Sequence, residues 1–106
     1  MKEIPEGLLE VIVRRLVEGM GAEKVILFGS YARGRPAEES DIDLLVVIPE
    51  TDEPRYRRAR RAYACLWGIW APVEVIVATS REVEEASKLP TSFLGQAIRY
   101  GRLLYG

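Results

Sequence analysis

The 106 residues of this chain predict a single domain, residues 1–106, large enough to bury one hydrophobic core. Its 15 basic and 16 acidic side chains nearly cancel, so wholesale electrostatic capture of nucleic acid is not expected. The absence of histidine excludes histidine-based catalytic triads and zinc sites that use histidine, but it leaves metal binding by carboxylates open.

Cysteine content and hydropathy predict a cytoplasmic protein. Cys65 is the single cysteine, which forbids an internal disulfide, and we expect it to behave as a small buried apolar residue. No apolar run approaches the roughly 18 residues of a membrane span. The N-terminal stretch MKEIPEGLLE lacks the basic-then-apolar pattern of a signal peptide.

The first half of the chain predicts one helix and two strands. Apolar residues recur at helical spacing over residues 8–17, which predicts an amphipathic helix. The runs KVILFG (residues 24–29) and DIDLLVVI (residues 41–48) predict two strands, because they are rich in β-branched and apolar side chains and are bounded by glycine and proline. A polar loop containing glycine and proline separates them.

The second half predicts a long helix, a strand and a short helix. A helix is expected over residues 53 to about 68, with Pro54 in its first turn. PVEVIVAT (residues 72–79) predicts a third strand. Ser80 is expected to act as the N-cap of a short helix over residues 81–87.

A last helix is expected from Ser92 to about Leu104, with Phe93 and Ala97 on its apolar stripe. The order of elements predicts an α+β fold: a small, mixed, three-stranded sheet backed by helices. The first two strands can pair antiparallel across their loop, and the third strand, reached through a helix, is expected to run parallel to the second.

Three acidic residues lie in or beside these strands. Strand alternation places Asp41 and Asp43 on one face and Ile42 and Leu44 on the other. Two adjacent carboxylates repel each other unless one is protonated or a cation lies between them, which favours a divalent metal over solvated surface acids. Glu74, inside the third strand, is the expected third carboxylate, with a salt bridge to an arginine of the long helix as the alternative. Oxygen ligands alone predict Mg²⁺ or Mn²⁺.

The turn FGSYARG follows the first strand. Gly29 and Gly34 allow backbone N–H groups to approach an anion closely, Ser30 adds a hydroxyl donor, and a short helical turn is expected after it. A plain turn is the alternative when the motif is taken alone. A phosphate site beside metal-binding carboxylates is what displacement at phosphorus requires, so the pattern predicts phosphoryl or nucleotidyl transfer.

At these residues the chain resembles the minimal nucleotidyltransferases of the DNA polymerase beta superfamily, whose pattern is Gly-Ser-x-Ala-x-Gly followed by a short loop and Ser-Asp-x-Asp-Leu. The matching positions are Gly29, Ser30, Ala32, Gly34, Ser40, Asp41, Asp43 and Leu44. The resemblance covers most of the chain and implies a polymerase-beta-like nucleotidyltransferase fold.

The resemblance also implies transfer of a nucleoside monophosphate from an NTP, usually ATP, with two Mg²⁺ ions. Asp41 and Asp43 then bind the metals, and Glu74 takes the third carboxylate position, where aspartate is more common in the family. Gly29 and Ser30 then hold the triphosphate. Ser40 belongs to the same implied nucleotide site, and Arg33 could clamp phosphates there, although a solvated loop arginine is the commoner case.

Many stand-alone members of this family resemble antitoxins that pair with a HEPN-domain ribonuclease toxin and inactivate it by adding AMP to a tyrosine. That resemblance implies a protein partner and a hetero-oligomer. Two alternatives stay open: a non-catalytic module that neutralises its partner by occlusion, and nucleotide addition to RNA 3′ ends.

Arginines and aromatic residues are concentrated in the long helix and just after it. The segment RYRRARRAY (residues 55–63) could bind RNA or an acidic partner, or could be a solvated helix face. Trp67 and Trp70 are expected in the core by default, with a partner surface as the alternative.

Overall fold

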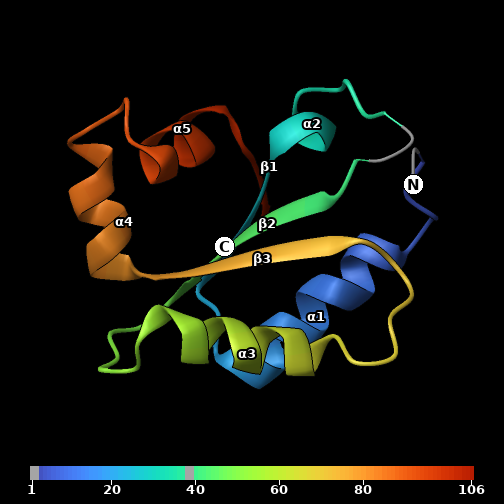
Figure 1. The fold of residues 1–106 in the computed structure, drawn as a ribbon, viewed down its shortest axis with the longest axis horizontal. Helices are drawn as coiled ribbons and strands as arrows, with labels where there is room; N and C mark the ends of the chain where they lie inside the picture. Colours follow the sequence, from blue (N-terminus) through green and yellow to red (C-terminus); the bar gives the residue numbers. More distant parts are fainter. Residues whose placement is uncertain (1–2, 38–39) are drawn as a thin grey trace.

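The computed structural model describes residues 3–37 and 40–106. Within these ranges a central sheet is flanked by helices (Figure 1). The elements in chain order are α1 (Leu8–Met20), β1 (Lys24–Phe28), α2 (Gly29–Ala32), β2 (Ile42–Ile48), α3 (Arg55–Cys65), β3 (Val73–Thr79), α4 (Ser80–Ser87), α5 (Phe93–Tyr100) and β4 (Arg102–Tyr105).

The sheet is mixed, as predicted, but it has four strands in the order β3-β2-β1-β4. β1 pairs antiparallel with β2, and β2 pairs parallel with β3, which confirms both expected pairings. The fourth strand, β4, pairs antiparallel with the other edge of β1. The expectation of three strands was therefore wrong by one edge strand.

The added strand replaces the end of the last helix, which was expected to run to about Leu104 and instead ends at Tyr100. Gly101 follows in an extended conformation, so close to β1 that a Cβ there would lie 2.6 Å from Cγ2 of Ile26 and 2.9 Å from the carbonyl oxygen of Leu27. Glycine allows this close approach. The chain then continues along β1, where its backbone groups join the ladder.

Helices cover both faces of the sheet (Figure 1). On one face, α1 and α3 pack over a core that includes Leu16, Leu44 and Val46. On the other face, α4 and α5 pack over a smaller core that includes Leu45 and Val47.

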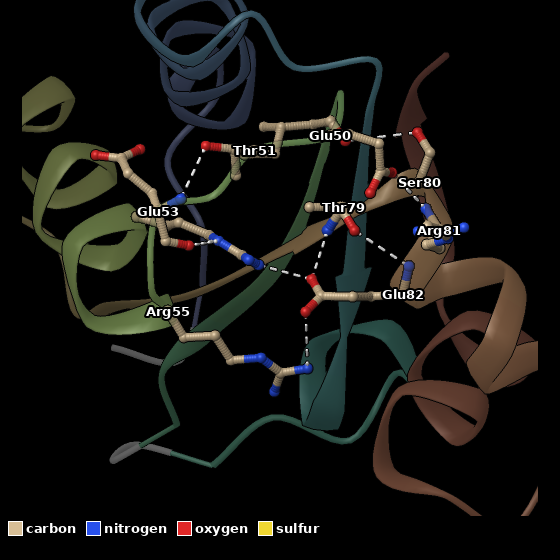
Figure 2. Close-up of polar contacts among 10 residues, drawn as sticks. Glu50, Thr51, Glu53, Arg55, Thr79, Ser80, Arg81 and Glu82 are labelled. Atoms are coloured by element: carbon tan, nitrogen blue, oxygen red, sulfur yellow. Dashed lines mark hydrogen bonds and ion pairs between the residues drawn. The ribbon is translucent and has the colours of Figure 1, made fainter.

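The starts of α3 and α4 differ from the predicted caps. Pro54 occupies the N-cap position of α3 and not its first turn, and the helix is shorter at both ends than residues 53–68. Thr79, not Ser80, is the N-cap of α4. Thr79 and Glu82 form a reciprocal capping box, in which each side chain accepts a hydrogen bond from the other residue's N–H, at 3.1 and 2.8 Å (Figure 2).

Arg58 of α3 is buried in the fold and does not belong to a solvated helix face. Arg58 is only 6% exposed. Its guanidinium donates to the Glu82 carboxylate at 2.6 Å and to the Glu53 carbonyl oxygen at 2.8 Å. Arg55 and Arg61 pair with the Glu82 and Glu53 carboxylates at 3.6 and 2.9 Å. The α3 arginines therefore tie the start of α3 to the start of α4.

Several large apolar side chains lie outside the core. Trp67 and Trp70 are 83% and 96% exposed, so the default expectation of core packing was wrong. Phe93, expected on the buried stripe of the last helix, is 60% exposed. Cys65 is half-buried beside the main core. In the described residues, no helix is both long and apolar enough to cross a bilayer.

Candidate nucleotidyl-transfer site

The predicted acidic residues lie near the N-terminal ends of the neighbouring strands β2 and β3. The register pairs Phe28 of β1 with Asp43 of β2, and Asp43 with Glu74 of β3. Asp41 lies just before β2, which begins at Ile42. Since side chains two residues apart share a face, Asp43 lies on the face of Leu45, the face on which α4 and α5 pack. The strands thus place Asp43 beside Glu74, and Asp41 is near enough to Asp43 to affect its ionisation.

The electrostatics of Asp43 reflect this crowding. Partial burial, the negative charges of Glu74 and Asp41, and a hydrogen bond between the Asp43 and Glu74 carboxyl groups raise the pKa of Asp43 above its ordinary value of 3.8. The positive charge of Arg33 opposes this rise in pKa. The neighbouring negative charges favour the neutral form of Asp43. A bound cation would have the opposite effect and would stabilise the ionised carboxylate.

The donor set fits a hard cation, since it consists of carboxylate oxygens without sulfur or imidazole. Glu74 is exposed on its edge strand, so the burial that was expected to make its charge costly is absent. The alternative of a salt bridge to the long helix is not seen either, because the paired arginines of α3 contact Glu53 and Glu82. Across residues 3–37 and 40–106, no three acidic or cysteine side chains already surround a common point at ligand distances. The three-carboxylate metal site therefore stays a prediction.

The predicted phosphate-binding turn lies directly against the acidic strand. Gly29 begins the short helix α2, with φ of 77°, a left-handed conformation that favours glycine. A Cβ at Gly29 would collide with the Asp43 carboxylate and come within 3.1 Å of its Cγ. Ser30 lies in the first turn of α2, where backbone N–H groups have no acceptor within the helix. The glycine thus brings the turn and the carboxylate into contact.

Arginine side chains border the same turn. A groove of about 600 Å³ is lined by Ser30, Arg33 and Arg35. Both arginines are exposed, and Arg33 is near enough to Asp43 to affect its ionisation. This groove has the positive charge and hydroxyl donor that a polyphosphate requires.

Ser40 forms local hydrogen bonds with Ala37. Its hydroxyl oxygen accepts a hydrogen bond from the Ala37 N–H at 2.8 Å, and its own N–H donates to the Ala37 carbonyl oxygen at 3.0 Å. These bonds join Ser40, the residue before Asp41, to Ala37. Nucleotide binding by Ser40 stays a prediction.

Two features of the site region were not found from the sequence. A cavity of about 580 Å³ beside Gly29 is lined by residues of α5, among them Phe93, Gln96 and Tyr100. In addition, the Tyr63 hydroxyl of α3 accepts a hydrogen bond at 2.9 Å from the Val75 N–H, next to Glu74 on the edge strand β3. The spacing of Phe93, Gln96 and Tyr100 on one helix face was the available signal, but it is equally typical of a buried stripe.

Comparison with known proteins agrees with this geometry. The family model described as "Nucleotidyltransferase domain" matches residues 9–101. The chain belongs to this family. The match includes the Gly29 turn and the candidate site residues Asp41, Asp43 and Glu74, and it confirms the resemblance drawn from the motif.

Individual relatives match over shorter segments. The protein adenylyltransferase MntA of Thermococcus cleftensis is 40% identical over 45 residues, which are 42% of this chain and 46% of MntA. Across the curated relatives, the matched segments span only 25% to 60% of the relatives' own lengths.

Solved structures share the fold. A crystal structure described as a toxin-antitoxin with AMP-PNP superposes with a TM-score of 0.60 at 24% identity, covering 92% of this chain and 72% of the other. A mutant of the toxin-antitoxin MntA-HpeT superposes with a TM-score of 0.56 at 21% identity, with the same coverage. These likenesses confirm the fold of the nucleotidyltransferase domain.

Proposed function

We propose that this chain transfers AMP from ATP to a hydroxyl group in a Mg²⁺-dependent reaction. The observation that carries the proposal is the contact between the Gly29 turn and Asp43, whose carboxyl group is influenced by Glu74 and Asp41. Membership of the nucleotidyltransferase family and the adenylyltransferase relatives support it.

The residues take separate roles in this reaction. Ser30 and Arg33 bind and orient the triphosphate in the groove that they line. Asp41 and Asp43 hold the divalent cation, with Glu74 as the third carboxylate. When bound, the cation neutralises charge on the attacking and leaving oxygens.

We also assign Glu74 a role toward the acceptor. It is exposed, and its carboxyl group is hydrogen-bonded to Asp43. It can therefore accept the proton of an incoming hydroxyl group while Asp43 stays with the cation. The Tyr63 hydroxyl fixes the adjacent backbone of β3 and so helps to position Glu74.

We propose a tyrosine of a HEPN-domain ribonuclease toxin as the acceptor. The support is a relative named a protein adenylyltransferase and neighbouring structures described as toxin-antitoxin complexes. The proposal makes this chain an antitoxin that acts by modifying its partner.

Label transfer tests the proposal. The protein is incubated with α-labelled ATP, Mg²⁺ and a candidate HEPN-domain toxin, and label on the toxin is measured. Asp43→Ala is expected to abolish transfer, whereas the control Asp52→Ala, which removes an exposed acidic residue before α3, is expected to leave it unchanged. Undiminished transfer by Asp43→Ala refutes the assigned site.

A second candidate is a non-catalytic antitoxin that blocks its partner by occlusion. The exposure of Trp67 and Trp70 favours it, because large exposed apolar side chains are typical of protein interfaces. Equal neutralisation of the toxin without ATP, and with Asp41 and Asp43 both replaced by alanine, supports occlusion over transfer. RNA 3′-end addition has less support, because three arginines of the basic helix are engaged by Glu53 and Glu82.

A further inference from the structure

The cavity between α2 and α5 carries aromatic side chains that the fold does not use for packing. Phe93 and Tyr100 each remain 60% exposed at its wall. Phe28 contacts Phe93 edge to face, with ring centroids 5.7 Å apart and planes at 90°. Aromatic rings left open to a cavity of about 580 Å³ are typical of a site for a flat apolar ligand.

This cavity adjoins the groove proposed to bind phosphate. Arg33 lines both, and the neighbouring residues Gly29 and Ser30 line one each. Gly29 also contacts Asp43 of the acidic cluster. A ligand that spans both sites has an anionic end near Ser30 and Arg33 and a flat end near Phe93. A nucleoside triphosphate has this shape.

Gln96 adds a directional group to the cavity wall. Its side-chain amide nitrogen donates to the Pro90 carbonyl oxygen at 2.6 Å, and a carbonyl can only accept, so the hydrogen bond fixes which end of the amide is which. The Gln96 carbonyl oxygen and its second N–H are then left to meet a ligand, as one acceptor and one donor. An acceptor beside a donor matches the N6 amino group and N7 of adenine, whereas guanine presents two acceptors, O6 and N7, at the same edge.

We propose that this cavity binds the nucleobase, that Phe93 and Tyr100 contact its ring, and that the Gln96 side-chain amide favours adenine over guanine. The inference rests on the proposed function, since it assigns a subsite and a base preference to the same nucleotide. It places α5 in substrate recognition, separate from the metal and phosphate contacts of β2 and α2.

Binding measurements separate the base from the phosphates. Titration calorimetry with Mg²⁺ and ATP, GTP or tripolyphosphate is compared for the wild type and variants. Phe93→Ala is expected to weaken ATP binding by about 10- to 100-fold, the range for loss of one base-stacking ring, and to leave tripolyphosphate binding within twofold. Phe93→Tyr keeps the ring and is expected to bind ATP like the wild type. Gln96→Leu is expected to bring the affinities for ATP and GTP together.

The matched control is Tyr56→Ala, which removes a 62% exposed aromatic ring from α3 on the opposite face of the sheet. It is expected to change no affinity. Thermal unfolding of Phe93→Ala checks that the variant is folded, which its exposure favours.

Each other outcome has one meaning. Equal loss of ATP and tripolyphosphate binding in Phe93→Ala, or no loss of either, overturns the base site. A Phe93→Ala variant that binds ATP normally but requires more acceptor assigns the cavity to the acceptor and also overturns it. A wild-type protein that binds neither ATP nor tripolyphosphate with Mg²⁺ refutes the proposed function itself.

Discussion

Replacing Gly29 by alanine tests the contact on which the site depends. Gly29 has a φ of 77°, and a Cβ added there collides with the Asp43 carboxylate. Gly34 offers a matched control, because its φ is 71° and, among the residues that the structure describes, no atom counted as a neighbour lies within 4 Å of the added Cβ. Both substitutions impose the same backbone strain, but only Gly29→Ala displaces a proposed metal ligand.

The structure gives the size of each effect. A left-handed backbone costs a non-glycine residue about 1–2 kcal/mol, so Gly34→Ala is expected to lower the free energy of unfolding by about that amount. Gly29→Ala imposes the same backbone strain and also forces the Asp43 side chain out of its rotamer. The second effect lowers the free energy of unfolding by about 1 kcal/mol more. Moving a catalytic group by about 1 Å can lower the rate by about 100-fold. Gly29→Ala is therefore expected to lose about 100-fold in label transfer, and Gly34→Ala far less.

Urea unfolding and label transfer are measured on both variants at a temperature where each is fully folded. The decisive quantity is the difference between the two variants, since the shared strain cancels. Equal transfer rates for Gly29→Ala and Gly34→Ala would falsify the claim that this contact positions Asp43.

Three further predictions concern stability. Arg58→Ala is expected to lower the free energy of unfolding at neutral pH by about 3 kcal/mol, because it removes one partner of a largely buried ion pair. Burial opposes ionisation of Glu82, but hydrogen bonds from the Thr79 N–H and Arg58 outweigh it and lower the pKa of Glu82 below its ordinary value of 4.5. The difference in unfolding free energy between the wild type and Arg58→Ala should therefore shrink as pH falls below 4.5. Asp43→Asn is expected to raise the melting temperature in metal-free buffer at neutral pH. The pKa of Asp43 in the folded protein is raised above 3.8, so the folded protein loses stability as pH rises from 3.8 through the raised pKa, and asparagine avoids this loss. Trp67→Ala and Trp70→Ala are each expected to change stability by less than about 1 kcal/mol, because the side chains are 83% and 96% exposed.

Controls and contrary results are specific to each prediction. Arg61→Ala breaks a more exposed ion pair with Glu53 and should cost less than about 1 kcal/mol, so an equal loss in Arg58→Ala contradicts the role given to burial. An Asp43→Asn variant less stable than the wild type in metal-free buffer contradicts the crowding of carboxylates. A loss of about 3–5 kcal/mol on truncating either tryptophan is the result expected of a core residue and contradicts the surface assignment.

The sequence was sufficient for the parts of the fold that depend on local pattern. Two apolar runs separated by a glycine-rich turn predicted β1 and β2, and strand alternation placed Asp41 and Asp43 on one face. The motif of glycine, serine and paired aspartates then predicted the nucleotidyltransferase family, which the family match confirmed.

The parts that failed depend on tertiary contacts. The run from Arg102 to Tyr105 is too short for its periodicity to separate a strand from a helical turn, and pairing with β1 decides the matter. Phe93 fits a helical apolar stripe, yet it opens to a cavity that only the position of α2 creates. Arg58 looked like one of several surface arginines because its partner, Glu82, lies 24 residues away in sequence.

Metal binding in the presence of nucleotide tests the central claim most directly. Mn²⁺ is titrated into the protein with a non-hydrolysable ATP analogue, and bound Mn²⁺ is measured by electron paramagnetic resonance in the wild type and in the double variant Asp41→Asn, Asp43→Asn. The account predicts that the wild type holds Mn²⁺ together with the nucleotide and that the double variant loses this protein-bound signal. Equal Mn²⁺ binding by both proteins contradicts the assignment of these aspartates as the metal ligands of a nucleotidyl-transfer site.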